Sequence, residues 1–111
     1  MNILSRAEEI ILLAIIKLED NAYGVTIREY IHKATGTIWS FASIYDPLHK
    51  LARKGYVKRH KQNTYPERGG RARCLYTITK DGKEALISLR QMHEQLSKDV
   101  PTSSLIESDS K

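Results

Sequence analysis

The sequence has a single cysteine, Cys74, so no disulfide bond can form within one chain. Its longest apolar run, Ile10 to Ile16, is far shorter than the roughly 20 residues that a membrane-spanning helix needs. The N-terminus lacks the basic start, apolar stretch and cleavage site of a signal peptide. These absences argue against a disulfide-stabilised secreted scaffold and a membrane helix, and we expect a cytoplasmic protein with no membrane partner.

Catalytic and metal-binding patterns are missing as well. The four histidines show neither H-x-x-x-H nor H-E-x-x-H spacing, and no second cysteine stands near them. The sequence has no glycine-rich phosphate loop, and it has no serine, histidine and aspartate in the order of a known hydrolase. We therefore predict that the protein is not an enzyme and that it holds no cofactor or metal ion.

Acidic residues are nearly absent from one window of the chain. Residues 50–73 contain nine lysines and arginines with Glu67 as the only acid, whereas acids outnumber bases in residues 1–49 and 74–111. Such a window can be a solvated face, but solvated faces usually mix the two signs. The excess of positive charge therefore favours a surface that binds a polyanion such as nucleic acid.

The remaining composition is that of one globular domain, because 41% of the 111 residues are hydrophobic and 28% are charged. Two helices are predicted near the N-terminus. Ser5 and Glu8 have the spacing of a capping box, which begins a first helix that is apolar on nearly all sides and hence central. A second helix is expected from 23 to 35, ended by Gly36.

A third helix is predicted to end near Gly55, with an apolar stripe on one side and a basic stripe on the other. Ser40 or Ser43 can cap it. Pro47 favours Ser43, because proline is tolerated close to a helix start, where its missing N–H does the least harm.

A hairpin and a fourth helix follow. Residues 56–61 and 74–79 are rich in strand-forming residues, and the segment that joins them is long for a hairpin turn. Thr79 can then cap a helix that runs from 80 to about 99. This order predicts a mainly α protein with a small β-hairpin (α+β): a winged helix-turn-helix domain plus a C-terminal dimerisation helix. We assign residues 1–79 to the DNA-binding domain, 80–100 to the dimerisation helix and 101–111 to a disordered tail.

Several motifs in this order resemble the PadR family of transcriptional regulators over about residues 8–86. They are EIILLAIIKL, NAYGVTIREYI, S-I-Y, L-x-x-L-A-R-K-G-Y-V and ERGGRARCLYTITKDG. The chain departs from the family where Asp46 separates Tyr45 from Pro47, and where Ala72 and Cys74 interrupt the basic residues of the wing. The resemblance implies a homodimeric, usually repressing protein that binds double-stranded DNA at a palindromic operator and dimerises through its C-terminal helix.

The DNA-binding residues predicted from this resemblance and from the basic window lie on the third helix and on the wing. Hydroxyl and basic side chains there can bond phosphates or base edges, and adjacent glycines let the wing backbone approach closely. The alternatives are that one serine only caps the helix and that Tyr45 belongs to the core. The predicted residues are Ser40, Ser43, Tyr45, His49, Lys50, Arg53 and Lys54 on the helix, and Arg68, Gly69, Gly70, Arg71 and Arg73 on the wing.

Residues of the fourth helix that are spaced three and four apart predict a dimer seam. They are Leu86, Leu89, His93, Leu96 and Val100. Trp39 is interpreted as a core or dimer residue, or alternatively as an aromatic wall for a small-molecule effector, whose identity stays open. The alternative function is a winged-helix interaction module whose basic face binds an acidic protein. Selective binding to one DNA sequence would distinguish a regulator from such a module.

Overall fold

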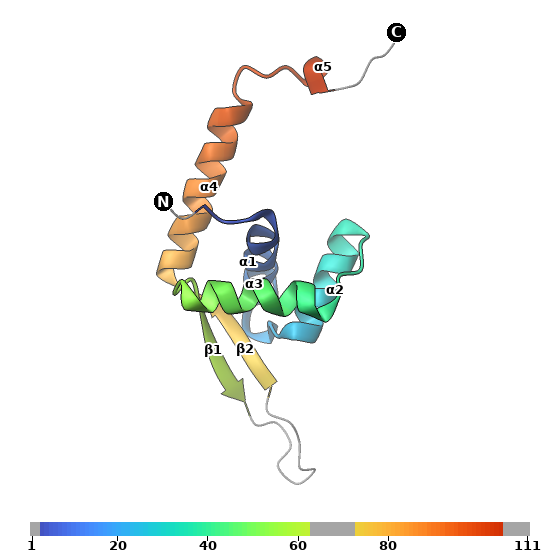
Figure 1. Cartoon of the computed structure of the whole chain (residues 1–111), viewed down its shortest axis with the longest axis vertical. Coiled ribbons are helices and arrows are strands. Elements are labelled where there is room, and N and C mark those ends of the chain that lie inside the picture. The colour runs from blue at the N-terminus through green and yellow to red at the C-terminus, as the bar shows by residue number, and fades with distance from the viewer. Residues whose placement is uncertain (1–2, 63–72, 106–111) are drawn as a thin grey trace.

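The structure is a computed structural model that describes residues 3–62 and 73–105. Figure 1 shows three helices above a two-stranded hairpin, with a long fourth helix that leaves the domain on the side away from the hairpin. The mainly α fold with a small β-hairpin is confirmed. The elements are α1 (Arg6–Leu18), η1 (Glu19–Asn21), α2 (Gly24–Thr35), α3 (Phe41–Arg53), β1 (Val57–Gln62), β2 (Arg73–Ile78), α4 (Lys80–Ser97) and α5 (Thr102–Leu105).

Helix α1 begins with the predicted capping box. The Ser5 side chain accepts a hydrogen bond from the Glu8 N–H (3.1 Å), and the Glu8 carboxylate accepts one from the Ser5 N–H (2.8 Å). The helix contacts α2, α3, β2 and α4, so it is the central element of the domain. This position explains why α1 is apolar on nearly all sides. Its fully enclosed residues are Ile11, Leu12, Ala14 and Ile15.

Helix α3 begins one turn earlier than predicted. Its cap is Ser40, whose hydroxyl accepts a hydrogen bond from the Ser43 N–H (3.1 Å), so the preference for a cap at Ser43 was wrong. Pro47 consequently lies inside the helix, where it cannot donate to the carbonyl four residues before it. Contacts with α2 accompany this earlier start, because Arg28 donates to the Trp39 carbonyl (2.6 Å) and packs over the ring of Phe41, the first residue of α3.

The hairpin pairs β1 with β2 in antiparallel register from Val57 opposite Ile78 to Gln62 opposite Arg73. The Tyr76 N–H donates to the Ala22 carbonyl (2.8 Å), which ties β2 to the segment before α2. Val57 and Tyr76 are buried at the domain end of the hairpin, so that end belongs to the core. The opposite end leads to residues 63–72, which lie outside the described part of the chain.

Helix α4 begins where it was predicted to begin. The Thr79 hydroxyl accepts from the Gly82 N–H (3.1 Å) and donates to the Gly55 carbonyl (2.7 Å), so the cap also binds α4 to the end of α3. The helix ends at Ser97, and Asp99 then has φ 70, so the chain turns before Pro101. A further helical turn, α5, begins the segment that was predicted to be a tail.

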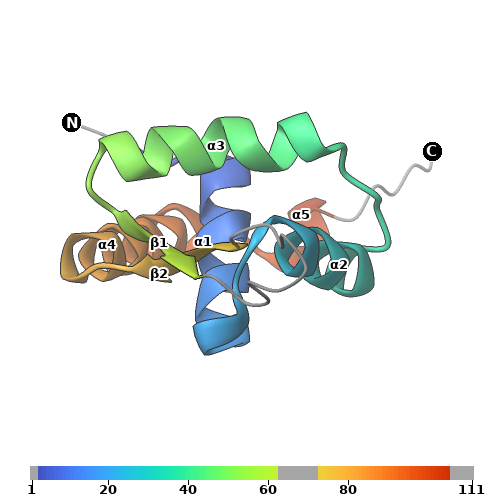
Figure 2. The same cartoon turned by 90° about the horizontal axis from the view of Figure 1, so that it is seen from below.

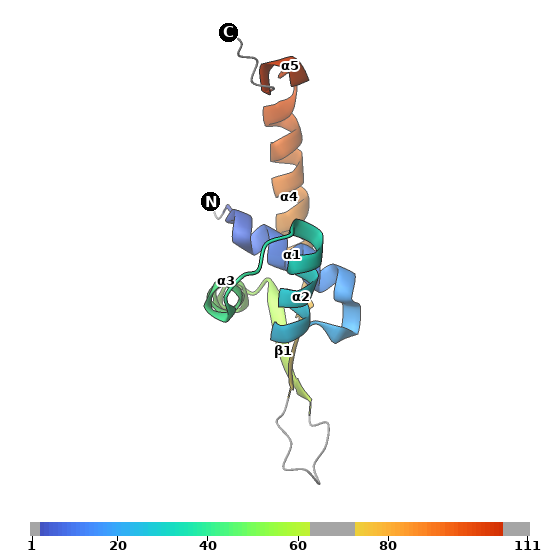
Figure 3. The ribbon, with the colours of Figure 1, turned by 90° about the vertical axis from the view of Figure 1, so that its right-hand side faces the viewer.

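Views along two further directions show how the elements are layered. In Figure 2 helix α3 lies along one side of the molecule, and no other helix or strand of the described residues covers its outer side. Figure 3 shows α4 extending from the domain in the direction opposite to the hairpin. Within the described ranges, no helix has the length and the hydropathy needed to cross a membrane.

Candidate nucleic-acid interface

The outer side of α3 collects five of the seven helix residues that were predicted to bind DNA. The buried positions of this helix face α1 and α2, so the polar positions between them face solvent. The exposed polar residues of α3 and its cap form a row of hydroxyl, basic and acidic groups: Ser40, Ser43, Asp46, His49, Lys50 and Arg53. Asp46 is the one acidic group of this row, and the row lies on a helix whose outer side is uncovered in Figure 2.

Lys54 does not join this row. Its ammonium group lies 2.9 Å from a carboxylate oxygen of Glu8, which is only 3% exposed. A buried carboxylate needs a cation or hydrogen-bond donors, and Lys54 is the basic residue that reaches it. Burial raises the pKa of Glu8, but hydrogen bonds from the Ser5 N–H and from Lys54 outweigh burial and lower it below its ordinary value. Lys54 therefore has a structural partner within the chain, and its contact with DNA stays a prediction.

Tyr45 is half-buried and forms part of an aromatic row on α3. Its ring centroid lies 6.3 Å from that of Phe41 and 6.3 Å from that of His49. Burial is the main reason that the pKa of Tyr76 rises to about 12, and the Cys74 thiol and the Tyr45 hydroxyl contribute in the same direction. The Tyr45 hydroxyl itself lies against Gly24 at the beginning of α2.

Arg28 of α2 holds the beginning of α3, a role that no sequence motif indicates. Its Nε donates to the Trp39 carbonyl (2.6 Å), and its guanidinium carbon lies 4.5 Å from the centre of the Phe41 ring. Trp39 packs against the core cluster and also lines a shallow hollow with Ser43 and Pro47. The effector role considered for Trp39 stays a prediction.

The hairpin continues the basic surface beyond α3. Residues paired across the strands project to the same face, so Arg59 and Lys61 share a face with Tyr76 and Cys74. This face packs on the domain at the beginning of the hairpin, because it includes the buried Val57 and Tyr76. Lys58 projects to the other face. Arg59, Lys61 and Lys58 all lie in the basic window of residues 50–73, but none of them is among the DNA-binding residues predicted from the sequence.

At the base of the wing, the guanidinium carbon of Arg73 lies 4.8 Å from the centre of the Tyr23 ring. Tyr23 directly precedes α2, so this cation–π contact joins the wing to the beginning of that helix. Four further predicted wing residues lie outside the described part of the chain. They are Arg68, Gly69, Gly70 and Arg71.

The domain therefore presents a helix with an uncovered polar side and a basic hairpin beside it. The model of the transcriptional regulator PadR-like family matches residues 12–88. The chain belongs to this family. The resemblance predicted from its motifs is confirmed, and as a PadR-like protein the chain is a DNA-binding transcriptional regulator rather than an enzyme.

Solved structures of PadR-like proteins have the same fold. A PadR-like transcription factor from Bacteroides fragilis superimposes with a TM-score of 0.73 and 24% sequence identity over 84% of each chain. A PadR-like regulator from Bacillus cereus gives 0.69 and 24% over 92% of each chain. A PadR family regulator from Clostridium difficile gives 0.64 and 22% over 89% of this chain and 98% of the other. No curated protein matches the chain.

The residues of the predicted dimer seam of this PadR-like chain differ in their exposure: some are buried against their own chain, and the others are exposed to solvent. Leu89 is 6% exposed and belongs to the core of its own chain, while Leu86 is half-buried against the same core. His93 is also half-buried, and its Nε2 lies 3.6 Å from a Glu9 carboxylate oxygen. By contrast, Leu96 is 67% exposed, and Val100 is 44% exposed and lies beyond the end of α4.

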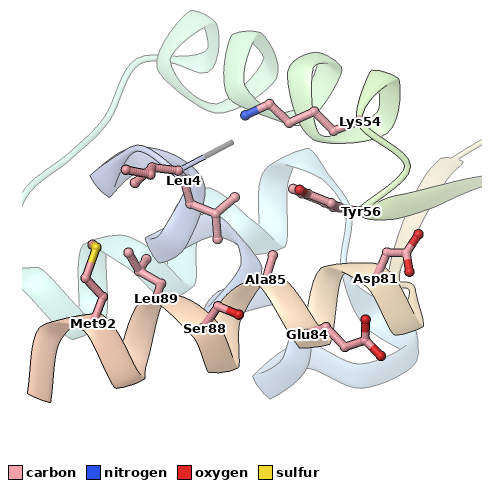
Figure 4. A pocket seen from close by; sticks show the side chains of 10 residues that line it. Leu4, Lys54, Tyr56, Asp81, Glu84, Ala85, Ser88, Leu89 and Met92 are labelled. Carbon is pink, nitrogen blue, oxygen red and sulfur yellow. The ribbon is translucent and has the colours of Figure 1, made fainter. Parts of the chain in front are cut away.

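A hollow of about 700 Å³ lies beside α4, between this helix and the beginning of the chain. Figure 4 shows side chains that line it, including Leu4 from the N-terminal segment and Leu89 and Met92 from α4. Asp81, Glu84 and Lys54 add charged groups at its border. The hollow therefore has an apolar part next to the segment of α4 where the chain's own core ends.

Proposed function

We propose that the protein is a homodimeric transcriptional repressor that binds a palindromic operator. The single observation that supports the dimer most strongly is the stripe formed by Gly82, Leu89 and Leu96, which are spaced seven residues apart on α4. The first two are buried in the domain, and Leu96 continues the same stripe into solvent. An apolar stripe that extends past its own core is typical of a helix that packs against a second copy.

The hollow beside α4 supports the same proposal. Its apolar residues lie next to the buried part of the stripe, and an antiparallel α4 of a second copy would bring the second copy's exposed stripe toward it. Full burial of a leucine side chain contributes roughly 1.5–3 kcal/mol, and two-fold symmetry applies that gain twice. The exposed residues on both copies would then be covered without any change to the domain.

The DNA contacts proposed for this dimer use the uncovered side of α3 and the face of the hairpin that carries Arg59 and Lys61. Two α3 helices related by a two-fold axis can enter successive major grooves about one helical turn apart. Lys50 and Arg53 then lie on the helix that meets base edges, and Arg59 and Lys61 lie where the hairpin meets phosphates. A dimer bound in this way covers its operator and represses by excluding other proteins.

The proposed function is tested by selecting duplexes from a random library with the purified protein. We expect a two-fold symmetric sequence that is bound at least about 1000-fold more tightly than a scrambled duplex of equal composition. Lys50→Ala should reduce affinity for the selected duplex by about 10-fold or more while affinity for the scrambled duplex falls less. Without sequence preference, the basic surface would instead suit the interaction module that binds an acidic partner.

The role in repression needs a second measurement with the selected sequence. Placed upstream of a reporter gene, it should lower expression when the protein is present, and Lys50→Ala should relieve that effect. An increase in reporter expression would instead identify an activator.

The two faces of the hairpin provide a further prediction. The slope of log affinity against log salt concentration is negative. Lys61→Ala should make it less steep by about 0.9, because one phosphate contact is lost. Lys58→Ala removes the same charge from the same strand on the other face, so its slope should stay close to that of the parent. Equal slopes for the two variants would contradict the proposed orientation of the hairpin on DNA. Filter binding or fluorescence anisotropy over a range of salt concentrations gives both slopes.

A further inference from the structure

Gly24 is the first residue of α2. A side chain would not fit at this position, whereas the backbone conformation does not require glycine. Among the described glycines, Gly36 and Gly55 have positive φ, and Gly24 does not. A Cβ atom at Gly24 would overlap the Tyr45 hydroxyl and would lie 2.5 Å from the Tyr45 Cζ. Glycine within a helix costs up to about 1 kcal/mol relative to alanine, and at this position its small size allows the close approach of α3.

The Tyr45 ring lies between two aromatic neighbours on its own helix. Phe41 and His49 flank it at one-turn intervals along α3, and Arg28 of α2 packs over Phe41. The hydroxyl end of Tyr45 lies over Gly24, where the beginning of α2 meets α3. A larger residue at position 24 would have to displace this ring or shift α3 away from α2.

We propose that Tyr45 is a positioning residue whose seating over Gly24 sets the orientation of α3 relative to α2 and the hairpin, and thereby the sequence selectivity of DNA binding. This inference rests on the proposed function, because only selective DNA binding makes that orientation matter. Tyr45 acts through Lys50 and Arg53, which lie on the same helix one and two turns farther along. Base contacts require side chains to be held within about 0.5 Å of their working positions, so a small rotation of α3 is enough to disturb them.

The test uses the duplex that the parent protein selects and a scrambled duplex of the same length and composition. Gly24→Ala should weaken binding to the selected duplex by about 10-fold or more and change binding to the scrambled duplex by less than about 3-fold, because phosphate contacts tolerate small rotations of α3. Val25→Ala is the matched control, since Val25 is the next residue of α2 and is exposed. It should bind both duplexes as the parent does.

Two substitutions of Tyr45 separate positioning from base recognition. Tyr45→Phe keeps the ring over Gly24, so it should retain selectivity to within about 3-fold, whereas a hydroxyl that bonds a base would lose about 10-fold or more. Tyr45→Ala should lose selectivity as Gly24→Ala does. Once the ring is absent, the three atoms nearest to the methyl group of Gly24→Ala are gone, and the double variant should bind the selected duplex no more weakly than Tyr45→Ala alone.

Several results would overturn the inference while leaving the proposed function intact. They are parent-like selectivity in Gly24→Ala, additive losses in the double variant, or loss of selectivity in Tyr45→Phe. Equal losses on both duplexes together with a lower melting temperature would also overturn it, since they indicate only a structural defect. Failure of the parent to select any sequence would instead count against the proposed function itself.

Discussion

Replacing Leu96 and Val100 with glutamate is expected to give a folded monomer that binds the selected duplex at least about 100-fold more weakly than the parent. Both residues are exposed, so the two carboxylates cost the single chain little. In the proposed dimer they would be buried against a second copy, where unpaired charges are strongly unfavourable. A monomer also loses the gain of binding two linked half-sites, which commonly amounts to 10²–10⁴-fold.

Sedimentation equilibrium and DNA titration together check this result. Ile87→Glu is the matched control, because Ile87 is exposed on the same helix but lies almost opposite Leu89 around its circumference. This control should remain dimeric and bind as the parent does. Leu89→Glu is unsuitable, because Leu89 is part of the chain's own core and its substitution would unfold the domain. A dimeric Leu96→Glu/Val100→Glu variant would show that α4 is not the dimer element.

The α4 stripe also shows what periodicity can and cannot predict. Helical spacing identified the apolar side of α4, and the threonine cap identified where the helix begins. Periodicity could not say which part of that side is covered by the same chain, because an apolar residue has the same spacing whether its neighbour is intramolecular or not. Leu89 and Leu96 differ only in their distance from the core, which is a property of the fold.

The serine before α3 illustrates a second limit. The preference for Ser43 came from the local cost of proline inside a helix, whereas the fold begins the helix at Ser40. The extra turn is held by the Ser40 cap and by the contacts of Arg28 with the Trp39 carbonyl and the Phe41 ring. Arg28 lies on another helix, so its contribution against the cost of about 3 kcal/mol for an internal proline does not follow from the local sequence. Local rules alone therefore could not decide between the two serines.

Contacts between distant residues were the hardest to predict. The contact of Arg28 with Phe41, the seating of Tyr45 over Gly24 and the pairing of Lys54 with Glu8 all join separate helices. A basic window predicts a binding surface, but it cannot show that one of its lysines forms an ion pair with a buried carboxylate far away in the sequence. The charge pattern therefore predicts where the surface lies, and the packing of helices shows which of its basic residues have partners within the chain.

The largest expected effect on stability follows from the Glu8–Lys54 pair. Lys54→Met keeps the apolar stem of the side chain but leaves the Glu8 carboxylate buried without its cation. Removing one partner of a buried pair costs roughly 3–5 kcal/mol, and we expect about 3 kcal/mol or less because the Lys54 side chain is 27% exposed. Urea unfolding at pH 7 and a fixed protein concentration measures the difference. The double variant Glu8→Gln/Lys54→Met should recover part of the loss, since no charge then remains buried.

The pair also predicts how stability depends on pH. Because the pKa of Glu8 is lower in the folded state than its ordinary value of 4.5, the folded state favours the carboxylate more than the unfolded state does. The stabilisation is therefore complete above about pH 4.5 and is lost as the pH falls through the lower folded value. Glu8→Gln should remove this part of the acid sensitivity.

Arg53→Met is the matched control for Lys54→Met, because it removes the neighbouring exposed charge. It should weaken DNA binding and leave the free energy of unfolding within about 0.5 kcal/mol of the parent's. If Lys54→Met instead matched the parent in stability and lost DNA affinity as Arg53→Met does, Lys54 would belong to the DNA-binding surface and the ion pair would have no structural role.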